Sequence, residues 1–210
     1  MTGKFITLEG IDGAGKSSHV PCISACIEKF GFRVHSTREP GGTPLGETLR
    51  RLLLNEKMHA DTEALLMFAS RREQLAVSIE PLLGNGVWVI CDRFTDSTYA
   101  YQCGGRGLPE ARVATLENWV HGALQPDLTF LFDAPIDVAR DRVNRGTTNP
   151  DKFEREQNEF FTRVRETYLR RAAQFPARIK VINSARDVAL IETELAAHIA
   201  VLAGRAAALS

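Results

Sequence analysis

Gly10-Ile11-Asp12-Gly13-Ala14-Gly15-Lys16-Ser17 is the stretch of sequence that decides the fold. It fits the pattern GxxxxGK[ST], follows the apolar run Phe5–Leu8 and opens a helical pattern that reaches Phe30. A strand, a glycine-rich turn and a helix in this order form a phosphate-binding loop, or P-loop. The backbone N–H groups of such a turn point at one anion, helped by the helix dipole. The whole loop is therefore predicted to bind ATP, with Lys16 on the β- and γ-phosphates and the Ser17 hydroxyl as a Mg²⁺ ligand.

Four more apolar runs alternate with longer helical patterns along the chain. They are Arg33–Ser36, Val87–Cys91, Leu128–Phe132 and Ile179–Ile182. Alternation of short strands with helices is typical of βαβ units, in which helices cover both faces of a parallel sheet. The sequence therefore predicts an α/β protein with a parallel sheet.

The expected helices have recognisable starts and stops. They cover Lys16–Phe30, Pro44 to about Leu54, Asp61 to near Leu83, Pro109–Gly122, and segments between Ile136 and Gln174. Thr43 and Asp61 have the side chains of N-caps, and Pro44 suits a first helical turn. Pro21 predicts a kink near Ser17–Ser18, because it removes a backbone donor inside the first helix.

Turn-forming residues from Gly146 to Pro150 interrupt the last helical region. Four basic residues flank the interruption, namely Arg142, Arg145, Lys152 and Arg155. They indicate either a mobile basic flap or a solvated charged surface. The interleaved acids favour the second interpretation.

Composition narrows the classes of protein that fit. The 210 residues favour a single domain spanning 1–210. The 26 basic and 26 acidic side chains cancel, so no global field attracts nucleic acid or anionic lipid. No apolar run approaches the ~18 residues of a membrane span, and the P-loop follows Met1 too closely to allow a secretory leader. With four cysteines, the chain is expected in the reducing cytoplasm.

Charged side chains follow the second and third expected strands. The third strand runs into Asp92-Arg93-Phe94, and the second ends in a loop that contains Arg38. Ligands of parallel sheets gather at the carboxyl ends of the strands. Asp92 could hold Mg²⁺ through water and Arg93 could clamp an acceptor phosphate, or the two could form a structural ion pair. Two converging arginines suggest that the acceptor is a phosphate monoester.

Taken together, these motifs resemble the bacterial thymidylate kinase family over about residues 1–183. The resemblance rests on Leu8-Glu9-Gly10 with the P-loop, Thr37–Thr43, Leu65–Ala69, Asp92-Arg93-Phe94 and Ala100-Tyr101-Gln102. It implies a three-layer P-loop NTPase fold, with a five-stranded parallel sheet flanked by helices. It also implies a homodimer and a LID that closes over ATP, at about residues 140–157.

The resemblance carries over roles in binding the acceptor, dTMP. It implies that Phe68 stacks on thymine and that Arg72, on the same helix face, donates to O4. Such a donor rejects the amino group of cytosine. Tyr101 is similar to a tyrosine that excludes a 2′-OH, and Ser97 and Gln102 are similar to residues that line the base pocket. Asp12 is similar to an acid that accepts from the 3′-OH or orients Mg²⁺-bound water.

For the chemistry, the resemblance implies a positive site made by Lys16, Mg²⁺, Arg38 and Arg93. Family members without an arginine in the P-loop carry a catalytic arginine in the LID, where this chain has Lys152. Lysine lacks the planar fork of arginine. Either Lys152 suffices, or Arg145 or Arg155 takes the role. Arg145 is also expected to bind ATP.

The expected reaction is phosphorylation of dTMP to dTDP by Mg-ATP, a step in dTTP synthesis. One alternative keeps the donor and changes the acceptor to another nucleoside monophosphate or a deoxynucleoside. A nucleotide-dependent switch is the alternative from another class. Switch GTPases read guanine with an NKxD motif, which is absent from this sequence.

Overall fold

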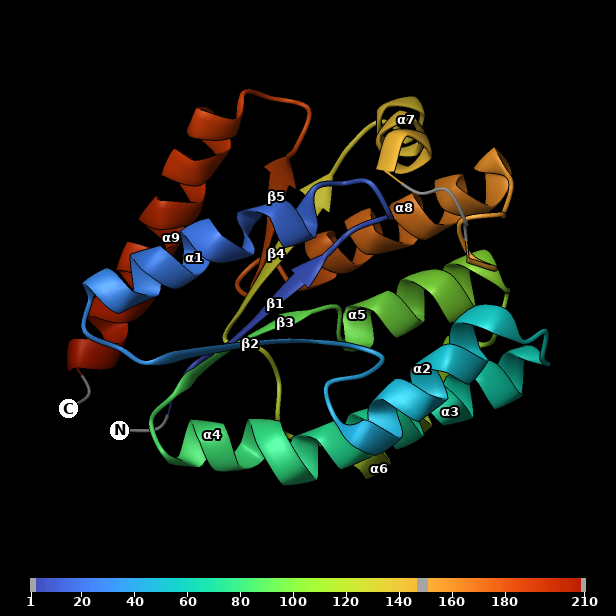
Figure 1. Ribbon diagram of the computed structural model, residues 1–210, viewed down its shortest axis with the longest axis horizontal. Coiled ribbons are helices and arrows are strands. Elements are labelled where there is room, and N and C mark those ends of the chain that lie inside the picture. The colour runs from blue at the N-terminus through green and yellow to red at the C-terminus, as the bar shows by residue number, and fades with distance from the viewer. Residues whose placement is uncertain (1–2, 147–150, 209–210) are drawn as a thin grey trace.

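One parallel sheet of five strands organises the molecule (Figure 1). The computed structural model describes residues 3–146 and 151–208. The strand order is β2-β3-β1-β4-β5. The strands are β1 (Phe5–Glu9), β2 (Val34–Arg38), β3 (Trp88–Asp92), β4 (Leu128–Asp133) and β5 (Ile179–Asn183). The predicted α/β class and parallel sheet are confirmed, and each strand extends one or two residues past its predicted carboxyl end.

Helical segments connect and cover the strands. They are α1 (Lys16–Lys29), α2 (Pro44–Asn55), α3 (Ala60–Gln74), η1 (Leu75–Ile79), α4 (Glu80–Gly84), α5 (Thr95–Thr98), η2 (Tyr99–Gly105), α6 (Glu110–Val120), α7 (Ile136–Gly146), α8 (Asn158–Gln174) and α9 (Val188–Ala208). The η segments are π-helices. The sequence patterns did not predict α5, η2 or α9. In the described part of the chain, no helix has the length and hydropathy of a membrane span.

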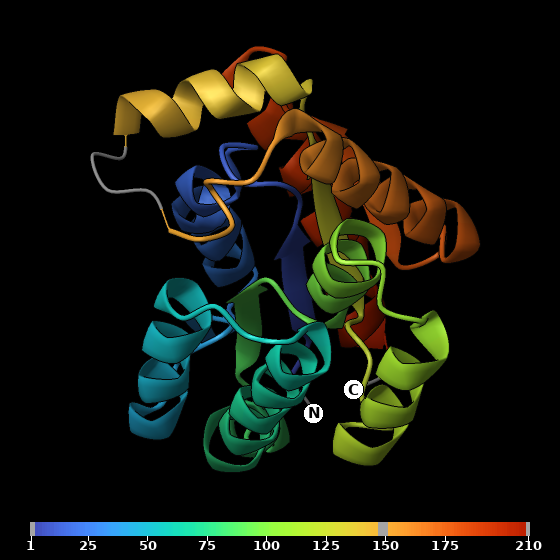
Figure 2. The same ribbon diagram turned by 90° about the vertical axis from the view of Figure 1, so that its right-hand side faces the viewer.

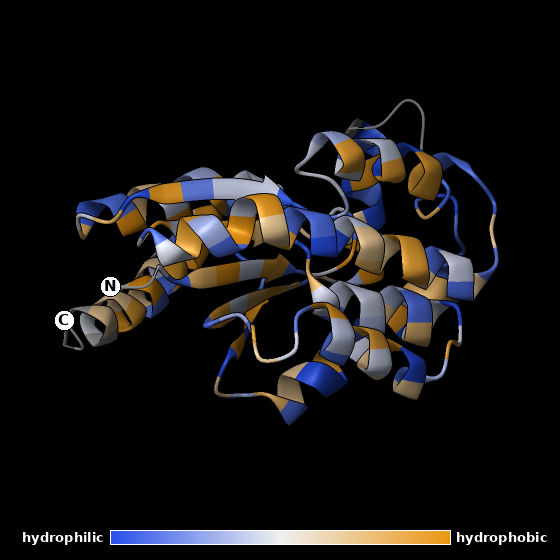
Figure 3. Ribbon diagram, turned by 90° about the horizontal axis from the view of Figure 1, so that it is seen from below, coloured by the Kyte–Doolittle hydropathy of each residue, from blue (hydrophilic) through white to orange (hydrophobic). Residues whose placement is uncertain are grey.

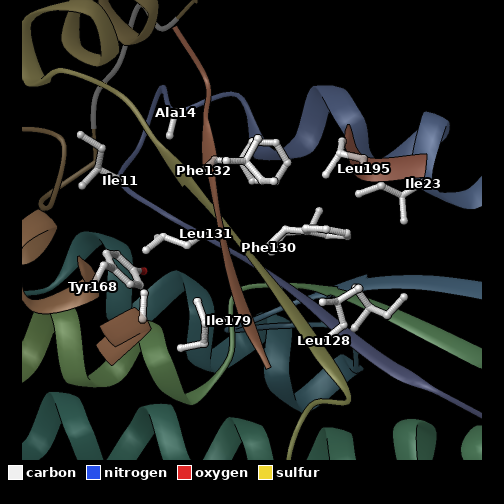
Figure 4. Close-up of a cluster of buried hydrophobic side chains, with 14 of the residues drawn as sticks. Ile11, Ala14, Ile23, Leu128, Phe130, Leu131, Phe132, Tyr168, Ile179 and Leu195 are labelled. Carbon is white, nitrogen blue, oxygen red and sulfur yellow. The ribbon is translucent and has the colours of Figure 1, made fainter. Parts of the chain in front are cut away.

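The two faces of the sheet are buried against different helices. Phe130 and Phe132 of β4 point toward Ile23 of α1 and Leu195 of α9, whereas Leu131 points toward Tyr168 of α8 (Figure 4). Successive side chains of a strand alternate between faces, so burial of all three residues requires helices on both sides. Accordingly, the central strands are largely hydrophobic while the surrounding helices mix hydrophobic and hydrophilic residues (Figure 3).

Of the two predicted N-caps, Thr43 caps its helix and Asp61 does not. The Thr43 hydroxyl accepts from the N–H of Gly46, which confirms the predicted cap of α2. The predicted cap at Asp61 is wrong: α3 starts one residue earlier, and the ring of His59 accepts from the N–H of Asp61. Asp61 lies in the first turn instead, where its carboxylate favours the helix dipole and pairs with Arg112.

The first helix is continuous from Lys16 to Lys29 with Pro21 inside it. The helix is thus unbroken at Ser17–Ser18, where the sequence predicts a kink. Gly31, with φ 82°, follows its end as predicted. Of the turn predicted at residues 146–150, positions 147–150 lie outside the described residues.

Strand pairing brings the chemical motifs to one edge of the sheet. Leu8 of β1 and Arg38 of β2 both pair with Asp92 at the end of β3. The P-loop, the loop after β2 and the turn after β3 therefore start side by side. The loop after β2 contains a cis peptide bond between Glu39 and Pro40.

Candidate active site

The P-loop backbone passes close to neighbouring backbone, which explains its glycines. Gly10 has φ 135°, and a Cβ there would lie 2.3 Å from the carbonyl oxygen of Phe132. Gly13 has φ 79°, and its Cβ would lie 2.0 Å from the carbonyl oxygen of Ala139 in α7. A side chain at either position would strain the backbone and displace its neighbour. The loop can therefore curl only with glycine at these two positions.

Lys16 lies inside the curl of the loop. Its buried Nζ donates to the carbonyl oxygens of Gly10 and Ile11, at 2.9 and 3.0 Å. Burial and then repulsion by Arg93 lower the pKa of Lys16 to about 8, against the attraction of nearby carboxylates. The ammonium is therefore still mostly protonated at pH 7, and its charge is held at the loop.

Ser17 and Asp92 form a pair of oxygen donors beside the loop. The Ser17 hydroxyl donates to Oδ2 of Asp92 at 2.7 Å, although the two residues are far apart in sequence. The other oxygen of Asp92, Oδ1, is buried and has no hydrogen-bond partner among the described residues. A hydroxyl with a carboxylate that has a spare oxygen suits Mg²⁺, which prefers oxygen ligands.

Arg93 connects the P-loop to the turn after β3. Its guanidinium donates to Oδ1 of Asp12 at 2.6 Å, to the Tyr101 hydroxyl at 3.1 Å and to the Gly10 carbonyl at 3.0 Å. Its backbone has φ 73°, a conformation that is rare without glycine. Burial raises the pKa of Asp12, but the charges of Arg93 and Lys16 outweigh it and lower the pKa to about 2. Asp12 is therefore an anion throughout the physiological pH range.

Two cavities meet at this ion pair. The first lies in front of the P-loop, has a volume of about 640 Å³ and is lined by Lys16, Ser17 and Asp92. The second extends toward α3 and has the apolar wall of a ligand pocket. The shared lining residues are Asp12, Glu39, Arg50 and Arg93. A phosphate group at this shared wall would be within reach of both cavities.

The residues of α3 that line the second cavity differ from those that the sequence predicts. Met67 and Arg71 line it. The guanidinium of Arg71 is buried, and it donates through Nε to Glu39 at 2.8 Å and through Nη2 to Thr98 at 3.2 Å. Its Nη1 is buried without a hydrogen-bond partner among the described residues. Arg71 therefore offers a spare donor on a fixed guanidinium in the wall of the cavity.

Phe68 and Arg72 require correction, because neither lines this cavity. Phe68 is fully buried in the core, with the guanidinium of Arg71 4.5 Å from the centre of its ring. Arg72 points away, to the carbonyl of Val120 in α6 and to Glu80. The turn of α3 directs residues 67 and 71 at the cavity, so residues 68 and 72 face α6.

The other predicted residues of the acceptor side gather around the shared wall. Tyr101, Ser97 and Gln102 line the second cavity, and Tyr101 donates to Oδ2 of Asp12 at 2.9 Å. Arg38 lines the first cavity, where its exposed guanidinium pairs with Glu47 at 3.0 Å. These positions agree with the expected sites but do not by themselves test the roles.

Lys152 also requires correction, because it is bonded away from the P-loop. Its Nζ forms an ion pair with the buried carboxylate of Glu63 at 2.7 Å and donates to the carbonyl of Glu56 at 3.1 Å. Glu63 also accepts from Gln102 at 2.8 Å. Lys152 is thus an anchor between the segment before α8 and helix α3. Figure 2 shows this segment, in orange, leading into α8.

Two further arginines line the P-loop cavity besides Lys16, Arg38 and Arg93, which the sequence singled out. Arg145 lies exposed in the last turn of α7. One turn earlier on that helix, Arg142 lines the cavity and donates to the carbonyls of Gly13 and Ser184, at 3.4 and 3.1 Å. Arg50 of α2 lines both cavities. The flanking charges predicted a basic segment near Arg142, but no sequence signal indicated Arg50.

We predict that Lys152→Met lowers the free energy of unfolding by about 2 kcal/mol, because it removes the nearer cation of the buried Glu63 carboxylate and leaves only Arg106, at 3.7 Å. Urea unfolding at pH 7 measures this. The matched control is Lys57→Met, at an exposed lysine, with an expected change within about 0.5 kcal/mol. Equal unfolding midpoints for the two variants would contradict the anchoring role.

Comparison with known proteins agrees with this geometry. The family described as thymidylate kinase matches residues 8–195. The chain is 57% identical to thymidylate kinase of Methylobacillus flagellatus over 195 residues, which cover 93% of this chain and 96% of the relative. It is 52% identical to that of Bordetella pertussis over 205 residues, covering 98% of each chain. The crystal structure of thymidylate kinase from Ehrlichia chaffeensis is similar with a TM-score of 0.75 and 33% identity, and covers 93% of this chain and 97% of that one. The chain therefore belongs to the thymidylate kinase family.

Proposed function

We propose that this enzyme transfers the γ-phosphoryl group of Mg-ATP to the phosphate of dTMP, giving dTDP and ADP. Membership of the thymidylate kinase family supports the reaction. The observation that carries it is the wall shared by the first cavity, in front of the P-loop, and the second cavity, which we name the acceptor cavity. Asp12, Arg50 and Arg93 belong to this wall. Two nucleotides in these cavities would bring their phosphates together at that wall.

ATP would bind with its phosphates in the P-loop and its γ-phosphate toward Arg93. The loop amides and Lys16 supply positive charge at the β- and γ-phosphates. The whole stretch Gly10–Ser17 is proposed to contact the donor. Arg142, which lines the cavity, is the arginine of α7 that would reach it, rather than Arg145.

Mg²⁺ would be held by Ser17 and, directly or through water, by Asp92. The residues fit the ion, because Asp92 Oδ1 is buried without a partner among the described residues and Ser17 lies 2.7 Å from Oδ2. When bound, the ion neutralises charge on the β- and γ-phosphates. The protein contributes the placement of these two oxygen donors at the loop.

Arg93, Arg50 and Arg38 are proposed to surround the acceptor phosphate and the phosphoryl group in flight. Arg93 is rigidly held, since Asp12, Tyr101 and Gly10 accept from its guanidinium. Phosphoryl transfer needs mainly alignment and stabilisation of charge. A fixed guanidinium can supply both without reorganising during the reaction.

The acceptor cavity has the features needed to recognise thymine. Leu54, Met67, Phe94 and Phe153 give it an apolar wall for a planar base. We propose that Arg71, in place of Arg72, donates from Nη1 to O4 of thymine. Glu39 and the rings of Phe68 and Phe94 hold its guanidinium in place. Cytosine would bring an amino group to this donor and leave both groups unpaired.

The sugar would lie next to Asp12 and Tyr101. Tyr101 is buried, and its hydroxyl bridges Asp12 and Arg93 at 2.9 and 3.1 Å. A bulky ring fixed in this way leaves no freedom to accommodate a 2′-OH. Ser97 and Gln102 are proposed to complete the pocket around the base and sugar.

We also propose a cytoplasmic, single-domain enzyme that acts as a homodimer. Four cysteines, all free, suit a reducing compartment. An apolar groove between α3 and α6 is lined by Leu65, Leu116 and Trp119, and Trp119 is 81% exposed. A second copy of the chain would bury this surface, as contiguous apolar patches commonly mark interfaces.

The reaction is tested by coupled ADP release from Mg-ATP, with dTMP, dUMP, dCMP, dGMP and UMP as acceptors. We expect dTMP to be the best acceptor and dUMP a weaker one. Selectivity against dCMP should exceed about 100-fold, because a dedicated hydrogen-bond donor faces position 4 of the base. Equal rates across the panel, or none, would reject the proposed substrate.

Two matched substitutions test which arginine of α3 reads the base. Arg71→Lys removes the planar fork and should lower kcat/KM for dTMP by about tenfold or more, with less discrimination against dCMP. Arg72→Lys should change both by less than about twofold, since Arg72 lies outside the cavity. A larger effect at Arg72 would reverse the assignment.

Analytical ultracentrifugation tests the dimer. The wild-type chain should sediment as a dimer at micromolar concentration, and Trp119→Asp should shift it to monomer because the charge would be buried at the interface. Asp61→Asn, on the neighbouring helix α3 and outside the residues that line the groove, should not change the sedimentation. A monomeric wild type would contradict the proposal.

A further inference from the structure

Glu9 is a fully buried carboxyl group at the end of β1, directly before the P-loop. It accepts from the N–H of Phe94 at 2.8 Å, from the Ser97 hydroxyl at 2.5 Å and from the Tyr168 hydroxyl at 3.1 Å. A buried carboxylate is costly unless donors satisfy it. These three donors come from the turn after β3, from α5 and from α8, so the group joins three separate parts of the fold.

The hydroxyls of Ser97 and Tyr168, which contact Glu9, also contact Arg93. Nη1 of Arg93 donates to Ser97 at 3.3 Å and to Tyr168 at 3.2 Å. The two hydroxyls lie 2.7 Å from each other. Each hydroxyl has one proton, so Ser97 donates to Glu9 and Tyr168 donates either to Glu9 or to Ser97. In both arrangements the lone pairs of the two oxygens are left for the guanidinium. The carboxylate thereby makes both hydroxyls acceptors for Arg93, although it does not touch Arg93 itself.

We propose that Glu9 is a positioning residue for Arg93, acting through the hydroxyls of Ser97 and Tyr168. The inference rests on the proposed function insofar as Arg93 contacts the acceptor phosphate. It explains how Nη1 is aimed, while Asp12 and Tyr101 hold Nη2. Without the carboxylate, the protons of the two hydroxyls can turn toward the guanidinium of Arg93. The hydroxyls then no longer accept from Nη1, and the guanidinium loses its fixed orientation.

The surroundings of Glu9 also make the arrangement sensitive to pH. Burial and the nearby Asp96 raise the pKa of Glu9 to about 7, although Ser97 and Arg93 oppose the rise. The charged and titratable groups that face it include Asp96, Arg93, Lys16, Tyr168, Cys91 and Arg178. Asp96 is itself paired with Arg171 and Arg178. Below the pKa of Glu9 the carboxyl is protonated, so the positioning should weaken as pH falls through 7.

Kinetics of Glu9→Gln test the proposal, because glutamine keeps the shape and removes the charge. We expect kcat/KM for dTMP to fall by about tenfold or more, with KM for ATP within about twofold of wild type. The wild-type profile of kcat/KM for dTMP should decline below pH 7 beyond the decline caused by protonation of the substrate phosphate. The variant should lack this extra decline, and Tyr168→Phe, which removes one of the two connecting hydroxyls, should show part of both effects.

Thr7→Val is the matched control, since Thr7 is equally buried on β1 but bonds to Thr129. It should keep the wild-type kinetics and pH profile. A Glu9→Gln variant with wild-type kinetics for dTMP overturns the proposal, as does an equal loss for ATP and dTMP, which would indicate a general structural role. If wild type phosphorylates dTMP and only the variant comparison fails, the proposed function stands.

A second measurement needs no substrate and so is independent of the proposed function. Nitrogen-15 NMR of the arginine side chains, with Arg93 assigned by Arg93→Lys, reports proton exchange at its guanidinium. Exchange should be about tenfold faster in Glu9→Gln than in wild type and unchanged in Thr7→Val. Only Glu9→Gln removes the carboxylate that orients the Ser97 and Tyr168 hydroxyls as acceptors for Arg93. Equal exchange in wild type and Glu9→Gln overturns the positioning role.

Discussion

The parallel register of β1 and β3 is the constraint on which the site depends. Leu8 pairs with Asp92, and the N–H of Arg93 donates to the carbonyl of Leu8 at 2.9 Å. The P-loop and the turn after β3 therefore leave the sheet at the same level. Ser17 can reach Asp92 and Asp12 can reach Arg93 only because of this register, since a shift by one residue would turn each side chain to the opposite face.

Polar groups at this edge satisfy one another across elements that are distant in sequence. Arg93 has a backbone conformation that is unfavourable for a side chain, with φ 73°, yet five acceptors on four elements or loops hold its guanidinium. Such strain persists where the surroundings over-determine a conformation, and it is concentrated at functional sites. The result is a rigid cation at the wall between the two cavities.

Helix α3 shows how packing assigns roles to adjacent, similar residues. Arg71 and Arg72 have the same side chain and the same helical surroundings in the sequence, but they point about 100° apart around the helix axis. Arg71 is enclosed by Glu39, Thr98 and two aromatic rings, whereas Arg72 bonds to the carbonyl of Val120 and to Glu80. The contacts of α3 with α2 and α6 decide which of them faces the acceptor cavity.

The sequence by itself determined the local elements and the edge at which they meet. The P-loop is readable because its glycines, Lys16 and Ser17 are consecutive, and the strand ending in Asp92-Arg93 is readable because buried strands are short and continuous. Only the tertiary structure decided which residues contact one another. It places Arg71 instead of Arg72 in the wall of the acceptor cavity, pairs Lys152 with Glu63, and brings Tyr168 of α8 beside Arg93. The physical reason is range, since spacing along a chain specifies a helix or a turn, whereas the contacts of a long side chain depend on how separate elements pack.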